Sequence, residues 1–391
     1  MSLLTALSLT ELRERRSAKW RTYEPDVLPL WVAEMDTPLA PPVAEALAAA
    51  VARGDTGYVW PGALAEAYAD FAGARLGWAP DPALSLLVPD VMRGIVEVLG
   101  VVTEPGDGVV VNPPVYPPFF SFLREARRRV VEVPLAEVRG GAYRLDLAGL
   151  EAAFAAGAAR AYLLCNPHNP TGTVFPREDL LAVAGLAQRY GVRLLADEIH
   201  APLAYPGTAA VPLLSLAAEA ESAARGFAFG STSKSWNLPG LKAALVFAGP
   251  AAGADLRAIS PDVPLSAGLL GVVAGEAALW EARSWLDELV AALDANRMLL
   301  AGLVAEHLPG VAYRPPDATY LAWLNCRGTG LGDDPAAPFL DRARVAVNPG
   351  PAFGGPGRGF VRLNFATSPE ILGEAVRRMA TALGAAVSPR R

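Results

Sequence analysis

Residues 231–242 read Ser-Thr-Ser-Lys-Ser-Trp-Asn-Leu-Pro-Gly-Leu-Lys, and they hold two of the three lysines in a chain that has 31 arginines. A guanidinium stays protonated and does not condense with aldehydes, whereas a lysine amine can lose its proton when it is desolvated or lies beside another cation. Lys234 is therefore a candidate for covalent bonding to an aldehyde, with Lys242 as the nearby cation. A composition biased towards arginine would also leave a few lysines at random, so the other segments must decide.

The composition is typical of a globular protein with a large core. Of the 391 residues, 52% are hydrophobic and 19% are charged, and the net charge is −6. The length predicts two or three domains, and the negative charge argues against general nucleic-acid binding. No apolar run reaches the ~20 residues of a membrane span, and the first residues lack the order of a signal peptide. Cys165 and Cys326 give no disulfide framework, so we expect a cytoplasmic protein with no membrane partner.

Short apolar runs alternate with helix-length amphipathic segments through the middle of the chain. This alternation predicts an α/β domain with a mostly parallel sheet. Seven runs are strand candidates, at 84–88, 108–111, 130–133, 161–165, 192–196, 226–229 and 243–247. Helices are expected at 91–102, 117–128, 147–156, 178–190 and 213–224.

The pattern changes after about residue 287 and predicts a smaller α+β domain. A long helix to residue 306 is followed by strand-like segments at 310–325, 345–347 and 360–364, and by a closing helix from 369 to about 383. We therefore expect an N-terminal segment that packs with the small domain (1–45), a large domain (46–286) and a small C-terminal domain (287–391).

Three polar, turn-rich segments follow strand candidates. Residues 166–172 read Asn-Pro-His-Asn-Pro-Thr-Gly, residues 197–200 read Asp-Glu-Ile-His, and residues 231–242 form the third segment. Ligands of parallel sheets bind in the loops beyond the carboxyl ends of the strands. The three segments are therefore expected to converge on a single pocket.

Other interpretations of these segments fail. Residues 197–200 also match a box found in nucleic-acid-dependent ATPases, but none of the lysines ends the phosphate loop that such enzymes need. His168 and His200 lack the ligand spacing of a zinc site, so no metal is expected. For His200 a buried structural role and a direct role both stay open. The glycine-rich residues 350–359 do not open a helix after a strand, so a loop is favoured over a dinucleotide site.

Taken together, these motifs resemble the fold-type I pyridoxal-phosphate enzymes, the aspartate aminotransferase superfamily. Within it the chain is similar to the cystathionine β-lyase branch that includes MalY and PatB, through residues 19–20, 29–36, 57–60, 112–119 and 360–366. The resemblance spans about residues 10–385. It implies a large domain with a mostly parallel seven-stranded sheet, a smaller α+β domain, and pyridoxal 5′-phosphate as the cofactor.

The resemblance also implies roles for residues around the cofactor ring. Lys234 would bind the cofactor aldehyde covalently and then act as the base on the substrate α-carbon. Asp197 would pair with the pyridine nitrogen and keep it protonated, so that the ring accepts electrons. Asn169 would bond the phenolate oxygen, and Tyr116 would stack on the ring and take part in catalysis. His200 is counted among the residues at the cofactor.

The phosphate and the partner subunit are the second part of the implied site. Ser231, Lys242 and the backbone amides of Val91 and Met92, where a helix begins, would bind the phosphate. Tyr58 would reach that phosphate from the neighbouring subunit, which implies a homodimer.

The implied substrate is a small amino acid. Arg362 would bind its α-carboxylate with both guanidinium nitrogens. Tyr58 and Trp60 would line the substrate side, and Tyr58 would assist proton transfer.

Two positions depart from the family pattern. Glu34 stands where these lyases usually have aspartate, so the substrate side of the pocket is expected to differ. Asp90 stands where relatives commonly have glycine at the phosphate turn. Because a carboxylate repels a phosphate dianion, Asp90 is expected to turn away and to cap the helix or pair with Arg93.

Three functions remain open at this point. The first is a carbon–sulfur β-lyase that converts L-cystathionine or related cysteine S-conjugates to a thiol, pyruvate and ammonia. The second is an aminotransferase, which uses the same residues. The third is a regulatory binding protein that keeps the cofactor fold. The match to the lyase branch favours the first, and the full catalytic set favours an enzyme over a regulator.

Overall fold

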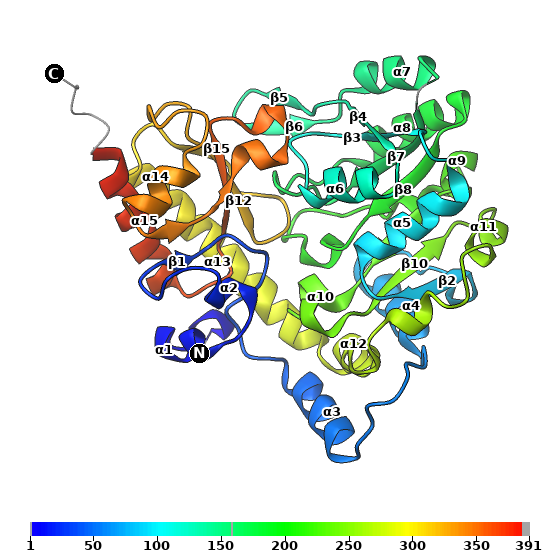
Figure 1. Cartoon of the computed structure of the whole chain (residues 1–391), viewed down its shortest axis with the longest axis horizontal. Helices are drawn as coiled ribbons and strands as arrows, with labels where there is room; N and C mark the ends of the chain where they lie inside the picture. The colour runs from blue at the N-terminus through cyan, green and yellow to red at the C-terminus, as the bar shows by residue number, and fades with distance from the viewer. Residues whose placement is uncertain (1, 158, 385–391) are drawn as a thin grey trace.

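A seven-stranded sheet forms the centre of the larger part of the computed structural model, which describes residues 2–157 and 159–384 (Figure 1). The strand order is β2-β10-β9-β8-β7-β3-β4, and β10 is antiparallel to both of its neighbours whereas the other pairs are parallel. The strands are β2 (Ser85–Val88), β3 (Gly108–Val111), β4 (Arg129–Glu132), β7 (Ala159–Cys165), β8 (Arg193–Asp197), β9 (Phe227–Gly230) and β10 (Ala244–Ala248). All seven strand candidates and the mostly parallel sheet are thereby confirmed.

Helices cover both faces of this sheet. Along β7, Leu163 packs in the cluster of buried residues that contains α5 (Val91–Val102) and α6 (Pro118–Glu125). Its neighbour Leu164 packs in the cluster that contains α7 (Leu147–Ala155) and α8 (Arg177–Tyr190). Successive side chains of a strand point to opposite faces, so a strand covered on both faces needs apolar residues at consecutive positions. This explains why the strands were recognisable as unbroken apolar runs.

One predicted helix of the larger part is wrong. Residues 213–224 form a 3-10 turn (Leu213–Leu216) and a separate short helix, α9 (Glu221–Ala224). The Leu213 amide donates to the buried Glu198 carboxylate at 2.6 Å, and Ala220 is extended with φ −139°. The extended backbone of Ala220 interrupts the helical pattern between the two segments.

The smaller part contains a four-stranded sheet of order β11-β12-β15-β14, drawn at the left of Figure 1. Its strands are β11 (Ala312–Tyr313), β12 (Leu321–Asn325), β14 (Asn348–Pro349) and β15 (Phe360–Asn364), and its long helices are α13 (Arg283–His307) and α15 (Pro369–Gly384). The predicted strand over 310–325 is therefore two strands. Pro315 and Pro316 lie between them, and proline cannot donate to a sheet.

The N-terminal residues pack beside the small sheet. β1 (Leu28–Pro29) pairs in parallel with β13 (Val345–Ala346), after the short helices α1 (Leu9–Glu14) and α2 (Ala18–Arg21). Farther along, α3 (Pro41–Ala52) and α4 (Leu64–Leu76) lead into the larger part, where α3 contacts α12 (Leu269–Glu281). The domain boundaries at residues 45 and 286 remain predictions, and residues 385–391 lie outside the described residues. None of the described helices has the length and apolar character that a membrane span requires.

Candidate active site

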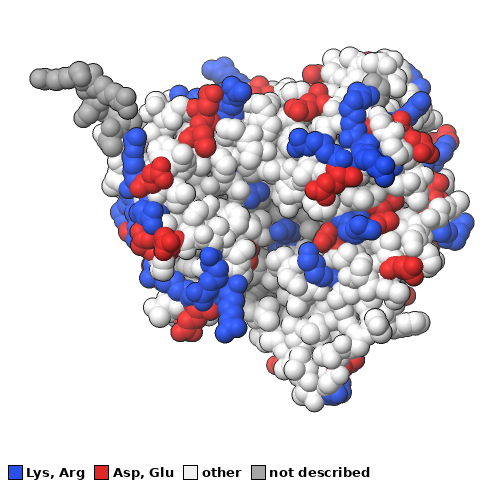
Figure 2. All heavy atoms as spheres, viewed as in Figure 1, with Lys and Arg blue, Asp and Glu red and all other residues white. Residues whose placement is uncertain are grey.

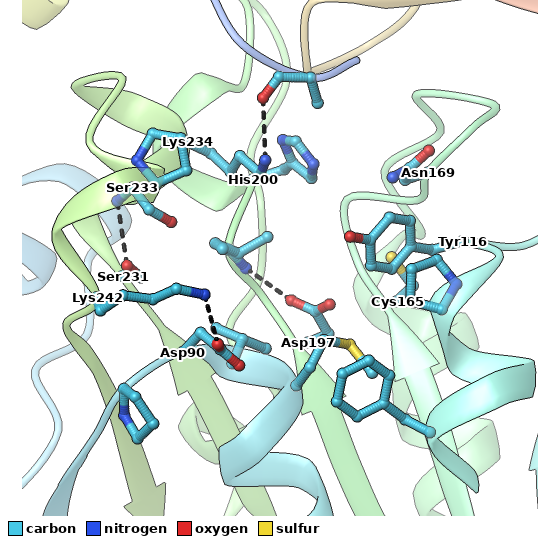
Figure 3. Close-up of a pocket in the computed structure, with 18 of the residues that line it drawn as sticks. Asp90, Tyr116, Cys165, Asn169, Asp197, His200, Ser231, Ser233, Lys234 and Lys242 are labelled. Carbon is cyan, nitrogen blue, oxygen red and sulfur yellow. Dashed lines mark hydrogen bonds and ion pairs between the residues drawn. The ribbon is translucent and has the colours of Figure 1, made fainter. Parts of the chain in front are cut away.

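The three polar segments meet at one cavity of about 280 Å3 at the carboxyl edge of the large sheet (Figure 3). The space-filling view shows a hollow near the middle of this face, with basic atoms inside it (Figure 2). The cavity wall contains most of the predicted site residues: Lys234, Asp197, Asn169, Tyr116, Ser231, Lys242, Val91, Met92 and His200.

Lys234 lies in a single helical turn, α10 (Thr232–Ser235), directly after β9. Its Nζ donates to the carbonyl oxygen of Ala33 at 3.0 Å. Desolvation and the nearby Arg362 guanidinium lower the pKa of Lys234 to about 8, although Asp197 opposes the shift. An amine with this pKa is partly neutral near physiological pH, so it can react with an aldehyde.

Asp197 ends β8 at the floor of the cavity. Its Oδ1 accepts from the Ile199 amide at 3.2 Å, and its side chain is buried. Burial raises the pKa of Asp197 to about 6, with the Ile199 hydrogen bond and Lys234 acting in the opposite direction. Such a carboxylate is suited to a cationic N–H partner, which would offset the cost of its burial.

Arg362 extends from β15 in the small sheet and is held by three acceptors. Nη1 donates to Asn169 Oδ1 at 3.0 Å, and Nη2 donates to the Trp31 carbonyl at 3.0 Å and to Asn348 Oδ1 at 2.8 Å. Its guanidinium lies over the Phe353 ring at 5.1 Å. Burial lowers the pKa of Arg362 to about 10, and its Nε is buried without a hydrogen-bond partner. The guanidinium is thus a cation held in place, and its Nε–H can still donate to a carboxylate ligand.

Asn169 and Tyr116 form the opposite wall. Because Asn169 Oδ1 accepts from Arg362, its Nδ2 is left to donate to a ligand. Tyr116 is half-buried and packs edge to face against Phe119, with 5.8 Å between ring centroids. Burial raises the pKa of the Tyr116 hydroxyl, so the ring presents a neutral aromatic face.

The first turn of α5 and the segment after β9 form the lower end of the cavity. Val91 and Met92 are the first two residues of α5, so their amides have no acceptor within the helix. Ser231 Oγ donates to the Ala243 carbonyl at 2.8 Å and accepts from the Ser233 amide at 3.1 Å. Lys242 lies beside them, and the group has the donors and the positive charge of an anion site.

Asp90 caps α5 as predicted, since its Oδ1 accepts from the Arg93 amide at 2.9 Å. The predicted alternative, an ion pair between Asp90 and the Arg93 side chain, is wrong. Arg93 pairs with Glu97 on the same helix, and Asp90 Oδ2 instead pairs with Lys242 Nζ at 3.0 Å. Asp90 therefore does not turn away from the site.

Residues 31–36, the N-terminal loop, close the cavity from the side of the small sheet. Tyr320 Oη donates to the same Ala33 carbonyl as Lys234, at 3.1 Å. Asn364 donates to the Glu34 carbonyl at 2.6 Å, and Asn237 exchanges two hydrogen bonds with the Met35 backbone. The hydrogen bonds of Tyr320, Asn237 and Asn364 to the N-terminal loop were not predicted, although Asn237 and Asn364 lie in residues 231–242 and 360–366.

Glu34 and two nearby histidines, of which only His200 lines the cavity, have defined neighbours. Ser17 Oγ donates to Glu34 Oε1 at 2.5 Å, so the longer side chain is held by the N-terminal segment. His200 contacts the Tyr320 ring edge to face, and its Nδ1 is buried without a partner. His168 is buried outside the cavity wall and bonds Thr171. Burial lowers the pKa of each histidine to about 3, so both are neutral.

Tyr58 and Trp60 do not reach the cavity of their own chain. They lie between α3 and α4, and their side chains are 92% and 77% exposed. Cys165 does line the cavity, but burial raises the pKa of its thiol far above the usual range, which argues against a nucleophile. Among the described residues, no group of three or more His, Cys, Asp or Glu side chains is arranged to hold a metal ion.

Comparisons with known proteins agree with this geometry. The model of the aminotransferase class I and II family matches residues 25–379. The chain is 50% identical to a Mycobacterium leprae protein named "putative cystathionine beta-lyase", over 97% of this chain and 98% of that protein. It is 39% identical to the cystathionine beta-lyase of Corynebacterium glutamicum, over 96% and 99% of the two chains. The crystal structure of cystalysin from Treponema denticola, which contains pyridoxal 5′-phosphate, superimposes with a TM-score of 0.90 at 25% identity and 98% coverage of both chains.

Proposed function

Because the chain belongs to the aminotransferase class I and II family, we propose that its cavity is the active site of a pyridoxal-phosphate-dependent carbon–sulfur β-lyase. The substrate is L-cystathionine or a related cysteine S-conjugate, and the products are a thiol, pyruvate and ammonia. The observation that carries the proposal is that the Lys234 amine and the Asp197 carboxylate line one cavity, beside the Arg362 guanidinium of the other sheet. That guanidinium donates to Asn169 in the cavity wall and lowers the pKa of Lys234.

The residues of the cavity fit pyridoxal 5′-phosphate. The cationic Lys242 and the acceptor-free amides of Val91 and Met92 suit a phosphate dianion. The buried Asp197 suits a protonated ring nitrogen, and the reactive amine of Lys234 suits the aldehyde. When bound, this cofactor withdraws electrons from the substrate α-carbon and so allows loss of the α-proton and of a thiolate from Cβ.

Arg362 orients the substrate in this proposal. Its Nε, buried and without a partner, is free for the substrate α-carboxylate, while Asn169 and Asn348 hold the other nitrogens. Because the guanidinium cannot rotate away from these acceptors, the carboxylate is bound in one orientation.

Lys234 moves the proton. Its amine would hold the cofactor aldehyde, and with substrate bound it would remove the proton from the α-carbon. The same amine delivers that proton to the departing sulfur, assisted by Tyr116 or by a tyrosine from a second subunit. The aromatic side chains of Tyr116 and Phe122, which line the cavity, would limit the access of water to this step.

The site is completed by a second copy of the chain. Tyr58 and Trp60 are largely exposed, and the family resemblance assigns Tyr58 to the phosphate of a neighbouring subunit. Val51 on α3 is another exposed apolar side chain close to them in the sequence, at 59%. A homodimer would cover these side chains and would bring Tyr58 to the partner's cavity. We also infer a cytoplasmic location, because Cys165 and Cys326 are both free.

The test is an assay with L-cystathionine alone. A β-lyase releases pyruvate continuously without an added keto acid. An aminotransferase stops after one turnover and resumes only when a keto acid is supplied, because its cofactor must be restored. Conversion of L-cystathionine to its own keto acid, without release of pyruvate and only when a keto acid is added, would therefore replace the lyase assignment with the aminotransferase. If L-cystathionine is not converted with or without a keto acid, the regulatory binding protein is favoured. A pull-down from cell extract would then test for a partner protein.

A further inference from the structure

Asp90 and Lys242 occupy the phosphate end of the proposed site as an ion pair. Their Oδ2 and Nζ atoms are 3.0 Å apart, and both residues line the cavity (Figure 3). The other carboxylate oxygen of Asp90 accepts from the Arg93 amide and caps α5. One carboxylate therefore engages both positive features of this end of the cavity, the ammonium group and the start of the helix.

An arriving phosphate needs the same two features. In the proposed function the phosphate is bound by Lys242 and by the first amides of α5, next to which Asp90 stands. A glycine, which is common at this position in the resembled family, would leave Lys242 unpaired and add no charge. With aspartate, the phosphate has to displace a carboxylate from Lys242 and then remain beside it.

We propose that Asp90 is an internal competitor of the cofactor phosphate for Lys242. Its carboxylate pairs with Lys242, as in the structure, and would release Lys242 when the phosphate binds. The pair thus weakens cofactor binding through the phosphate alone and favours release of the cofactor. This inference rests on the proposed function, because it assumes that the phosphate binds at Lys242.

The first experiment compares Asp90→Asn with the unmodified protein. Asparagine still caps a helix but carries no charge, so α5 keeps its first turn. Cofactor is removed, and binding of pyridoxal 5′-phosphate is followed by the quenching of tryptophan fluorescence. We expect the Kd of Asp90→Asn to fall roughly three- to tenfold, because one exposed ion pair and one like-charge contact are removed. Pyridoxal, which lacks the phosphate, should bind both proteins equally.

Two further variants make the test specific. Glu97→Gln removes a carboxylate that pairs with Arg93 on the same helix and does not line the cavity, so the Kd should not change. In a Lys242→Gln background, the gain in cofactor affinity from Asp90→Asn should shrink to less than half, because no ammonium group remains for which Asp90 and the phosphate compete.

The possible outcomes separate the inference from the proposed function. Unchanged or weaker phosphate-cofactor binding by Asp90→Asn would overturn the inference, as would an equal gain for pyridoxal. If Asp90→Asn improves the affinity equally in the Lys242→Gln background, Asp90 acts by repelling the phosphate directly and does not compete for Lys242, which also overturns the inference. If the unmodified protein and all variants fail to bind pyridoxal 5′-phosphate, the proposed function itself is wrong.

Discussion

Lys19 and Asp36 form an ion pair in which neither side chain is accessible to solvent, with 2.8 Å between Nζ and Oδ2. Trp20 Nε1 donates to the other carboxylate oxygen at 3.0 Å, and Lys19 also donates to the Glu34 carbonyl at 3.1 Å. The pair therefore joins α2 to the N-terminal loop, whose Ala33 carbonyl accepts from Lys234. Lys19 therefore has a structural role, which is to position the N-terminal loop beside the cavity.

Replacing Lys19 by methionine should destabilise the protein by about 3–5 kcal/mol, because it leaves the Asp36 carboxylate buried without a counterion. Chemical denaturation would measure the loss. Arg358→Gln is the matched control, since it breaks an ion pair with Asp333 in which both side chains are about 70% exposed, and it should change stability little. Equal effects of the two substitutions would contradict the importance of burial.

Lys234→Ala should abolish covalent attachment of the cofactor and reduce turnover by at least ~100-fold, since it removes the general base. Attachment is detected as added protein mass after reduction of the imine with borohydride. Lys242→Gln should retain the covalent bond but bind the cofactor more weakly. Added mass in Lys234→Ala that disappears when Lys242 is also replaced would reassign the reactive amine to Lys242.

Attachment of the cofactor should depend on pH through Lys234. Only the neutral amine reacts, and burial places its pKa at about 8, so the rate should rise as the pH increases through about 8 and then level off. Arg362 also lowers this pKa. Arg362→Gln should therefore move the midpoint to higher pH, which rapid-mixing absorbance measurements on both sides of the midpoint would follow. A midpoint that moves down would show that the guanidinium does not depress the amine pKa.

Tyr58→Phe should weaken cofactor binding by about 1.5–3 kcal/mol, the contribution of one charge-assisted hydrogen bond. The expected dimer allows a sharper measurement by mixing subunits. A hybrid of a Tyr58→Phe subunit and a Lys234→Ala subunit contains one site with native Lys234 and native Tyr58 if the tyrosine acts across the interface. Activity of the mixture above that of either variant is the expected result. No recovery, or a monomer in sedimentation that retains its cofactor fully, would refute the shared site.

Local patterns were sufficient to predict the large sheet and the meeting of its three polar segments. β3, α5 and β15 have the predicted bounds, because each is an apolar run or helix with clear breaks on both sides. The convergence of residues 166–172, 197–200 and 231–242 also followed, since parallel strands place their carboxyl ends at one edge.

Contacts between residues far apart in the sequence were not predictable from these patterns. Tyr320 reaches the Ala33 carbonyl across 287 positions, and Lys242 reaches Asp90 across 152. The first contact depends on how the small sheet packs against the N-terminal loop, and the second depends on the pairing of β10 with β2 in the large sheet. A single sequence carries no periodic signal for either arrangement. For the same reason, the pairing of Asp90 was predicted with the wrong cation.

The distribution of the three lysines determines how the protein will respond to reagents that acylate or cross-link amines. Lys19 is fully buried, and Lys234 lines the cavity and donates to the Ala33 carbonyl, whereas the Lys242 side chain is 57% exposed. Most of the cationic surface consists of guanidinium groups, which such reagents leave unmodified. Modification will therefore concentrate among the lysines at Lys242, where a bound phosphate would shield it. The extent of labelling at that one side chain becomes a direct footprint of whether the site is occupied.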